Sequence, residues 1–363
     1  MQKLILVIGA TGAQGLAVID KLLEPSQDGT QSPYSVRALT RNPDGARAKE
    51  LAARGVDVVK GAFNDFPVVL AALQGVWGVW NNTDGFTVGE MKELYAGVRI
   101  FELAKQVGTV RHYVWSNLDY SLKKGGWNPT YCADHYNGKG RVADWMKAQP
   151  SIVSDTDMSW AVVTSGPYME MLLFWMFGPL GQRPDGTAVF AAPIGDGHVP
   201  MVALDDLGFF ARYAFDHRAD VAGRDLEVAS ARVGWAELAA TYARVTGRRA
   251  EYLPLSLDEW LGPIANERGQ GGRGGGGRGD VGAHVPRVLG AVAGRRRRPR
   301  LGVAEGGEPG GHTLESWMRA KGYKGVEGDT GRTTVLKNVE EGKSVRLNFQ
   351  RVEDLLASKK PVS

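Results

Sequence analysis

The sequence predicts an α/β protein built on a doubly wound parallel sheet, with a small C-terminal lobe. Two observations predict this fold class. Short apolar runs alternate with amphipathic helical segments over the first 165 residues, and this alternation requires parallel strands joined by right-handed crossovers. In addition, an unbroken apolar run from Lys3 to Ile8 leads directly into a glycine-rich turn and an apolar helix, Leu16 to Leu23.

The turn between this first strand and helix has glycine at positions 9, 12 and 15. Such glycines let the chain turn tightly, bring its backbone close to a pyrophosphate and pack the helix against the strand. The amides at the helix N-terminus attract the same anion. An ordinary tight turn would also use glycine, but the buried strand before it and the apolar helix after it favour a dinucleotide site.

The other elements follow in order along the chain. Strands are predicted over 34–40, 56–61, 75–80, 112–116 and 159–164, which are apolar or β-branched runs bounded by turn residues. Helices are predicted over 43–54, 66–73, 91–107 and 139–148. The helix at 91–107 is the most clearly amphipathic, and its predicted apolar face carries Leu94, Val98, Phe101, Leu103 and Ala104.

Side chains that follow the second and fourth strands lie where this fold places its ligand crevice. At the end of the second strand an acid would accept a hydrogen bond from a ribose hydroxyl, whereas an arginine would pair with a 2′-phosphate. Arg41 stands there, so the sequence favours NADP(H), although a solvent-facing arginine would look the same. Asn82 and Thr83 are placed to meet the ribose or diphosphate, and a plain turn rich in asparagine is the alternative.

Composition predicts a globular protein of a reducing compartment. The chain has 363 residues, of which 43% are hydrophobic, enough for one large α/β domain with an added lobe. Cys132 is the single cysteine, which excludes an intrachain disulfide, and we expect no metal site. The first apolar run is short, and the longest later one, Met171 to Phe177, cannot span a bilayer. We therefore expect no signal peptide, no membrane association and a cytoplasmic location.

Residues 268–311 differ from the sequence on either side. Nine of the fourteen residues from Gly269 to Gly282 are glycine, four arginines follow at 295–298, and the stretch contains no aromatic residue. It holds nine of the 44 basic residues, so the positive sign of the chain's net charge of +4 comes from this stretch. Such a composition cannot bury a core and predicts disorder.

Three interpretations of this stretch compete. It is a flexible linker, an arginine- and glycine-rich arm for nucleic acid, or a stretch translated out of frame. Missing aromatic stacking partners argue against nucleic acid. We favour the frame error, because codons can be chosen for which the shifted frame encodes an amphipathic helix with tryptophan.

The segment from His135 to Lys139 occupies the place of the Tyr-x-x-x-Lys pair of ordinary short-chain dehydrogenases. In that pair the tyrosine donates a proton, and the lysine lowers the tyrosine pKa and holds the ribose. Here histidine stands four residues before Lys139, and neither Tyr136 nor Tyr131 has the required spacing. Hydride transfer without the tyrosine requires that Lys139, His135 or a water supplies the proton, or that the acceptor needs little acid help, as a quinone would.

Several motifs together resemble the NmrA-like family of atypical short-chain dehydrogenase/reductases. They are the glycine turn at 9–15, Thr40-Arg41-Asn42-Pro43, the segment His135 to Lys139, Val199-Pro200-Met201 and Asp205-Asp206-Leu207-Gly208. The likeness covers residues 3 to about 262 and resumes at Thr313-Leu314-Glu315-Ser316-Trp317.

The resemblance implies a Rossmann domain that prefers NADP(H), closed by a small C-terminal lobe. It implies that Arg41 holds the 2′-phosphate, that Asn82 and Thr83 contact the middle of the cofactor, and that Lys139 contacts the nicotinamide ribose with Tyr168 nearby. The pyrophosphate would be held by Gly9, Ala10, Thr11, Gly12, Ala13, Gln14 and Gly15. Relatives commonly carry an acid near the adenine after the third strand, and because Gly61 to Asp65 departs from that pattern, Phe63 is a candidate to stack there instead.

The expected organisation has four parts. Residues 1–165 form the NADP(H)-binding domain, 166–262 supply the remaining sheet elements and the substrate lobe, 263–312 form the anomalous segment, and 313–363 form a helix capped by Thr313 with a tail. The Met- and aromatic-rich segment 167–177 is interpreted as lobe packing, and its position after the sixth strand makes it the best candidate for a substrate-pocket wall.

The predicted function is NADPH-dependent reduction of a small organic substrate, either a quinone, a carbonyl or a conjugated double bond. Lys139 and His135 are the candidate catalytic residues. The resembled family also contains NADP(H) sensors that regulate transcription through protein partners. The alternative is therefore a non-catalytic redox sensor with a regulatory protein partner and a nuclear location.

Overall fold

The computed structural model describes residues 2–26, 28–263, 301–302, 311–325 and 347–360. The chain divides into two compact units. The first comprises Met1–Tyr120, Asp134–Ser165 and Leu204–Val228, and the second comprises Ser121–Ala133, Gly166–Ala203 and Ala229–Ser363. Apart from residues 301–302 and 311, the predictions for the segment 268–311 lie outside the described residues.

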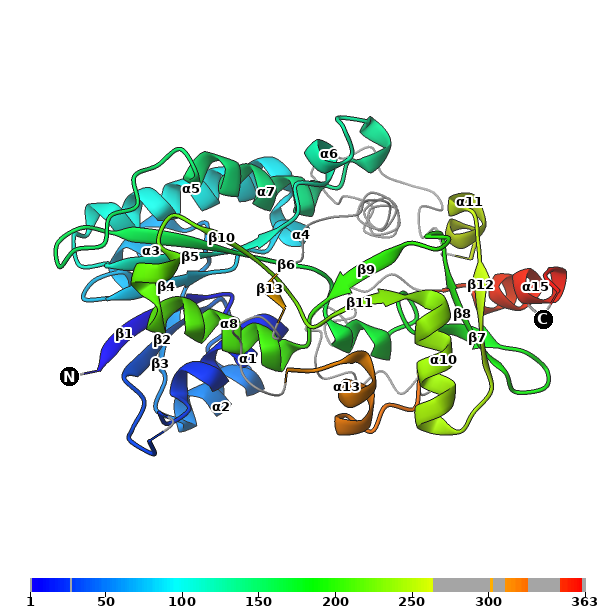
Figure 1. Cartoon of the computed structure of the whole chain (residues 1–363). Coiled ribbons are helices and arrows are strands. Elements are labelled where there is room, and N and C mark those ends of the chain that lie inside the picture. Colours follow the sequence, from blue (N-terminus) through cyan, green and yellow to red (C-terminus); the bar gives the residue numbers. More distant parts are fainter. Residues whose placement is uncertain (1, 27, 264–300, 303–310, 326–346, 361–363) are drawn as a thin grey trace. The chain divides into compact units, whose positions relative to one another are not determined.

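The first unit is a parallel sheet with helices on both faces (Figure 1). Seven of its strands pair in the order β10-β6-β5-β4-β1-β2-β3, and each of these pairs is parallel. Their bounds are β1 Lys3–Ile8, β2 Tyr34–Thr40, β3 Asp57–Lys60, β4 Gly78–Asn81, β5 His112–Leu118, β6 Ser159–Ser165 and β10 Asp225–Ala229. This confirms the predicted doubly wound α/β fold.

The helices of this unit form two layers. Their bounds are α1 Ala13–Leu23, α2 Ala46–Ala53, α3 Phe66–Ala72, α4 Gly85–Val88, α5 Glu90–Gln106, α7 Asp134–Met146, α8 Leu204–Asp216 and α9 Arg218–Val221. Helices α1 and α8 lie on one face, and α3, α5 and α7 lie on the other (Figure 1). Within each layer backbones approach closely at glycine, since a Cβ on Gly208 of α8 would lie 2.5 Å from the carbonyl oxygen of Ala17 in α1.

Several predicted boundaries were wrong, and glycine explains two of the largest differences, at the starts of α7 and β4. Helix α7 begins at Asp134, five residues before its predicted start, although Gly138 and Gly140 lower helix propensity. Both glycines are sites of close approach, because a Cβ on Gly140 would lie 2.4 Å from that of Tyr120. Strand β4 begins at Gly78 rather than Gly75, whose φ of 73° belongs to a turn.

The predicted apolar face of α5 was right at Phe101, Leu103 and Ala104 and wrong at two positions. The residues it buries are Glu93, Ala96, Gly97, Ile100, Phe101, Leu103 and Ala104, whereas Leu94 and Val98 are only half-buried. The centre of the buried face is formed by small residues, and a Cβ on Gly97 would lie 2.6 Å from Val142 of α7. Close packing at Gly97 and the buried side chains of Ile100, Phe101 and Leu103 together set the orientation of α5, in which the carboxylate of Glu93 is also buried.

The second unit is built on a three-stranded sheet, β12-β8-β7, and a two-stranded antiparallel ribbon, β11-β9. Its strands are β7 Pro179–Gln182, β8 Ala188–Ala192, β9 His198–Met201, β11 Ala231–Gly234 and β12 Ala250–Pro254. The two-residue β13 Leu301–Gly302 pairs instead with β10, at the edge of the large sheet. The helices of the second unit are α6 Ser121–Lys124, α10 Trp235–Thr246, α11 Leu257–Leu261, α13 Leu314–Ala320 and α15 Phe349–Ser358, with short 3₁₀ helices at Pro129–Tyr131 and Met169–Leu173.

The core of the second unit explains the Met- and aromatic-rich segment. Met169, Leu172, Met176 and Phe177 are buried in one cluster with Trp317 and other side chains of this unit. The interpretation of the segment as lobe packing is therefore confirmed for these four residues, and a role in a substrate-pocket wall stays a prediction.

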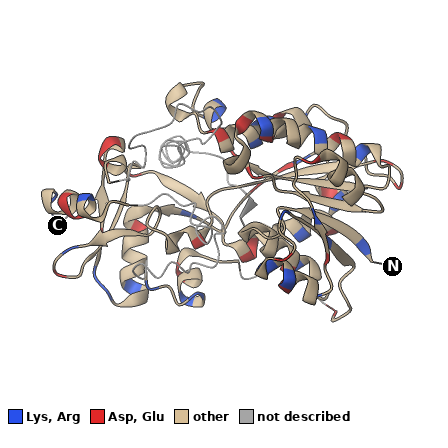
Figure 2. Ribbon diagram, turned by 180° about the vertical axis from the view of Figure 1, so that it is seen from behind, with Lys and Arg blue, Asp and Glu red and all other residues tan. Residues whose placement is uncertain are grey.

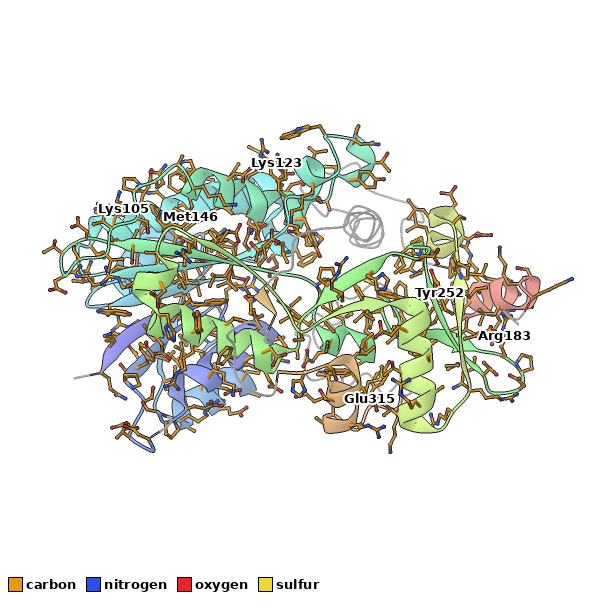
Figure 3. All side chains as sticks on the ribbon, in the orientation of Figure 1. Lys105, Lys123, Met146, Arg183, Tyr252 and Glu315 are labelled. Atoms are coloured by element: carbon orange, nitrogen blue, oxygen red, sulfur yellow. The ribbon has the colours of Figure 1, made fainter. Side chains whose placement is uncertain are left out.

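Two helices from the C-terminal part of the chain belong to this unit. Thr313 caps α13 as predicted, because its hydroxyl accepts a hydrogen bond from the amide of Ser316 at 3.0 Å. Helix α15 is held by Arg183, which Figure 3 labels beside it. The Arg183 guanidinium pairs with Glu251 at 2.7 Å and donates hydrogen bonds to the carbonyl oxygens of Leu356 and Lys359.

Charge in the described residues is mixed in sign. Figure 2 shows Lys and Arg interspersed with Asp and Glu along the helices of both units. Among the described helices, none combines the length and the apolar composition needed to cross a bilayer.

Candidate functional site

The glycine turn after β1 brings backbone segments into close approach. Gly9 has a φ of 80°, and a Cβ there would lie 2.6 Å from the carbonyl oxygen of Asn82. A Cβ on Gly15, in the first turn of α1, would lie 2.2 Å from the carbonyl oxygen of Gly9. The packing of strand, turn and helix therefore requires glycine at both positions.

Gly12 is constrained differently. Its φ is −80°, which any residue can adopt, and among the described residues a Cβ there would meet only the carbonyl oxygen of Gly9, at 3.3 Å. It is the N-cap of α1, and no side chain caps this end of the helix. The first amides of a helix have no acceptor within the helix, so a bare helix start with space beside it fits an anion. The turn thus fits a pyrophosphate.

Two arginines border this turn. Thr40, which ends β2, places its hydroxyl oxygen 3.4 Å from that of Thr11, so Arg41 follows the strand close to the turn. The Arg41 guanidinium is half exposed and lies 3.8 Å from the carboxylate of Asp84. Arg47 of α2 donates a hydrogen bond to the carbonyl oxygen of Thr11 at 3.0 Å. Sequence reasoning missed Arg47 and Asp84, because neither belongs to a recognisable motif.

Lys139 lies at the carboxyl end of the sheet, within a shell of oxygen atoms. Its Nζ donates hydrogen bonds to Asn82 Oδ1 at 3.0 Å, the Ser116 carbonyl oxygen at 3.3 Å and Thr83 Oγ1 at 3.4 Å. It also lies 5.0 Å from the centre of the Trp115 ring. The predicted residues Asn82, Thr83 and Lys139 are therefore brought together by β4, β5 and α7.

The negative charge that pairs with Lys139 belongs to Glu93, a residue that sequence reasoning missed. Glu93 Oε1 lies 3.5 Å from Lys139 Nζ, with side-chain exposures of 0% and 8% for the two residues. Burial lowers the pKa of Lys139 and raises the pKa of Glu93, while the attraction between the two charges opposes both shifts. Thr83 contacts both members of this pair, because its hydroxyl also donates a hydrogen bond to Glu93 Oε1 at 2.7 Å.

Gln14 links the glycine turn to the lysine. Its side-chain oxygen accepts a hydrogen bond from Ser116 Oγ at 2.7 Å, inside the buried part of the unit. The carbonyl oxygen of the same Ser116 accepts from Lys139. The predicted pyrophosphate turn and the predicted ribose-binding lysine are thus connected through one residue of β5.

His135 lies one helical turn before Lys139 on α7 and is almost fully buried. Its ring packs against Phe86 of α4 with centroids 4.2 Å apart, and edge to face against Tyr136 at 4.7 Å. Phe86 is 44% exposed, so this aromatic pair is open to solvent on the Phe86 side. A catalytic role for His135 stays a prediction.

Tyr168 belongs to the second unit. It forms an isolated parallel bridge with Val202, and burial together with the charge of Glu170 raises its pKa to about 12. The hydroxyl therefore stays protonated at neutral pH. Its predicted place near the nicotinamide ribose stays a prediction.

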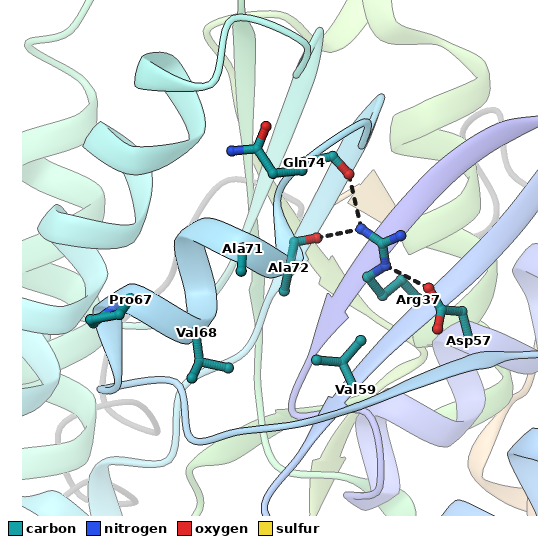
Figure 4. Close-up of a pocket in the computed structure, with 8 residues that line it drawn as sticks. All are labelled: Arg37, Asp57, Val59, Pro67, Val68, Ala71, Ala72 and Gln74. Carbon is teal, nitrogen blue, oxygen red and sulfur yellow. Dashed lines mark hydrogen bonds and ion pairs between the residues drawn. The ribbon is translucent and has the colours of Figure 1, made fainter.

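A separate surface pocket, of about 520 Å³, lies beside β2, β3 and α3 (Figure 4). Its arginine, Arg37, is paired with Asp57 at 2.6 Å and donates to the carbonyl oxygens of Ala72 and Gln74. Asp57 is the first residue of β3, so this pocket lies away from the carboxyl ends of the strands. It is not part of the site around Lys139.

The Rossmann fold, with a lysine at the carboxyl edge of its sheet and histidine in place of the tyrosine, defines an atypical short-chain dehydrogenase/reductase. The chain belongs to the NmrA-like family, whose family model matches residues 1–266. An NmrA-like family domain-containing oxidoreductase, FrzB of Cladobotryum sp., is 30% identical over 278 residues, which cover 72% of this chain and 78% of FrzB. The family prediction is confirmed.

Solved structures share the fold. NmrA, a negative transcriptional regulator crystallised in complex with NADP, superposes with a TM-score of 0.61 at 18% identity, covering 97% of this chain and 98% of that one. An NADPH-dependent quinone oxidoreductase from Escherichia coli superposes with a TM-score of 0.57 at 20% identity, covering 80% and 88%.

Proposed function

We propose that the first unit binds NADP(H), with the pyrophosphate at the glycine turn and the 2′-phosphate at Arg41. The space beside Gly12 and the uncapped start of α1 support the first contact. The half-exposed guanidinium of Arg41, which directly follows Thr40 beside the turn, supports the second, and Arg47 adds positive charge beside Thr11. The complex of NmrA with NADP is consistent with this proposal.

Arg41→Ala is expected to weaken NADPH binding about 10- to 100-fold and to leave NADH binding unchanged, since only NADPH carries the phosphate that the guanidinium would bind. Calorimetric titration with both nucleotides measures this. Arg54→Ala is the matched control. Arg54 directly follows α2, and it pairs with Asp20 at 2.6 Å on the surface. Equal affinity of the unmodified protein for NADPH and NADH would contradict the assignment of Arg41.

Gly15→Ala is expected to lower stability, whereas Gly12→Ala is expected to weaken NADPH binding. A Cβ at Gly15 meets backbone at 2.2 Å, so this change should lower the free energy of unfolding by about 1 to 3 kcal/mol or more. A Cβ at Gly12 fills the space proposed for the pyrophosphate, so this change should weaken NADPH binding at nearly unchanged stability. Urea denaturation and fluorescence titration separate the two effects, and unchanged NADPH affinity in Gly12→Ala would remove the proposed pyrophosphate site.

We propose further that the protein is an oxidoreductase that reduces a quinone, a carbonyl or a conjugated double bond of a small organic substrate. NADPH, when bound, supplies the hydride. The observation that carries this proposal is Lys139, an almost fully buried ammonium at the carboxyl ends of β4 and β5. A three-donor group in this place can bind the ribose hydroxyls and supply a proton to the acceptor atom. The activities named for FrzB and the quinone oxidoreductase support the same class.

A second function is favoured by one specific observation. Position 135 holds histidine rather than the proton-donating tyrosine, and its ring is packed against Phe86 and Tyr136. A protein that binds NADP(H) without turnover and is read by a regulatory partner would need no proton donor there. NmrA itself is described as a negative transcriptional regulator.

The experiment that tests the function is NADPH consumption in the presence of quinones, aldehydes and conjugated ketones, followed by absorbance. Turnover with at least one acceptor is the expected result. Tight binding of NADPH with no turnover across the panel would support the sensor instead. Failure to bind either nucleotide would contradict both.

A further inference from the structure

Glu93 is the least exposed ionisable residue at the site. Its side chain is fully buried in the first turn of α5, where Oε1 faces Lys139 Nζ at 3.5 Å and accepts from Thr83 Oγ1 at 2.7 Å. Burying a carboxylate and an ammonium costs several kcal/mol for each ion, which only close pairing and hydrogen bonds offset. A pair of this kind needs a reason beyond stability.

The fold makes room for this carboxylate with two glycines. A Cβ on Gly85, which begins α4, would lie 2.1 Å from Glu93 Oε2, and a Cβ on Gly138 of α7 would lie 2.8 Å from the same oxygen. Gly138 directly precedes Lys139. Any larger residue at either position would push the carboxylate away from the ammonium, so α4, α5 and α7 together hold the pair.

Other charged and aromatic side chains lie near the pair. Asp84, at the end of β4, adds a second negative charge that favours the ammonium of Lys139, and it is itself 3.8 Å from Arg41. The Trp115 ring of β5 lies 5.0 Å from Lys139 Nζ, and His135 lies one turn before Lys139 on α7, which also carries Asp134, Tyr136, Arg141 and Asp144. Of Asp84 and Glu93, Glu93 is the one in direct contact with Lys139.

We propose that Glu93 is a positioning residue for Lys139, whose carboxylate keeps the lysine charged and directed toward Asn82 and Ser116. This inference rests on the proposed function, in which Lys139 binds the nicotinamide ribose. Glu93 acts through Lys139, and its second contact at the site is the hydroxyl of Thr83, which also lies 3.4 Å from Lys139 Nζ. The site is thus a lysine held by a buried acid from α5, in place of a lysine working with a tyrosine from its own helix.

Loss of the Glu93 charge should change the pH dependence of NADPH binding and turnover. Burial alone lowers the pKa of Lys139, and the charge of Glu93 raises it again. Without that negative charge the lysine should release its proton at lower pH. Binding and turnover that need the ammonium should then fail at lower pH than in the unmodified protein.

The test compares Glu93→Gln, Glu93→Asp and Glu90→Gln. Competitive labelling with acetic anhydride, read by mass spectrometry of the Lys139 peptide, measures the pKa of Lys139 without any cofactor. NADPH affinity and turnover are measured over the same pH range. Glu90→Gln is the matched control, because Glu90 joins the same helices through a 2.8 Å pair with Arg141 near the surface.

In Glu93→Gln we expect the pKa of Lys139 to move about one to three pH units lower. The pH above which NADPH affinity falls should move lower with it. Glu93→Asp keeps the charge at a greater distance and should shift both in the same direction by less, and it serves as the test if the glutamine variant does not fold. Glu90→Gln should shift neither. An unchanged Lys139 pKa in Glu93→Gln, or in Glu93→Asp where glutamine is not tolerated, overturns the inference. Failure to bind NADPH defeats the proposed function alone, because the labelling readout does not depend on it.

Discussion

Lys139→Met is expected to reduce kcat for NADPH-dependent reduction by about a hundredfold or more, the range expected when a positioned proton donor is removed. Methionine keeps most of the side-chain volume but cannot donate to Asn82, Ser116 or the proposed ribose. The measurement is steady-state kinetics with the best acceptor of the panel. Lys147→Met is the matched control, since Lys147 directly follows α7 and pairs with Asp225 at 2.8 Å at the surface.

This substitution also leaves Glu93 buried without its counter-charge, so lost activity needs to be separated from lost stability. In Lys139→Met the pKa of Glu93 should rise further, because the attraction that opposes burial is gone. The double variant Lys139→Met with Glu93→Gln removes both charges and should recover much of the stability. Recovery of turnover in the double variant, or full turnover in the single one, would exclude a chemical role for Lys139.

Trp317→Ala is expected to lower the free energy of unfolding by about 3 to 5 kcal/mol. Trp317 is fully buried in the core of the second unit, and its Nε1 donates to Glu170 Oε1 at 3.1 Å. The change opens a cavity and removes a hydrogen bond from a buried carboxylate. Urea denaturation followed by circular dichroism measures the loss.

Trp127→Ala provides the comparison, because Trp127 belongs to the same unit but is 61% exposed. Its effect should stay within about 0.5 kcal/mol. Trp317→Phe should lie between the two, since it keeps an aromatic ring and loses the donor. Equal stability of Trp317→Ala and the unmodified protein would mean that α13 does not contribute to the core.

The parallel sheet could be predicted from the sequence because its strands are marked by local patterns. Strands β1 and β2 have the predicted bounds, since each is an apolar or β-branched run bounded by polar or glycine residues. The helices were harder to predict where packing overrides propensity. The glycines in α7 and Gly97 on α5 look unfavourable locally, and they lie at positions where a Cβ would meet a neighbouring residue.

Some residues of the candidate site could likewise be predicted from the sequence, and others could not. Asn82 and Thr83 could be placed from the sequence, because the carboxyl ends of parallel strands border the ligand crevice. Lys139 was placed through the family resemblance, and its Nζ lies within hydrogen-bond distance of both residues. Glu93 could not be placed, since an acid on an amphipathic helix is normally solvated, and its burial depends on contacts with two other helices. Whether Tyr168 joins these residues stays a prediction.

The first unit takes its last two helices and its last strand from Leu204–Val228, after the chain has contributed Gly166–Ala203 to the second unit. A nascent chain that has left the ribosome only as far as Ser165 therefore lacks α8, whose Gly208 packs against the backbone of α1, and lacks β10, which pairs with β6. Such an intermediate presents an apolar helix face and an open strand edge, two features that promote aggregation. Recombinant fragments cut at the end of β6 should consequently collect in inclusion bodies, and productive dissection of this protein requires residues 204–228 to be retained.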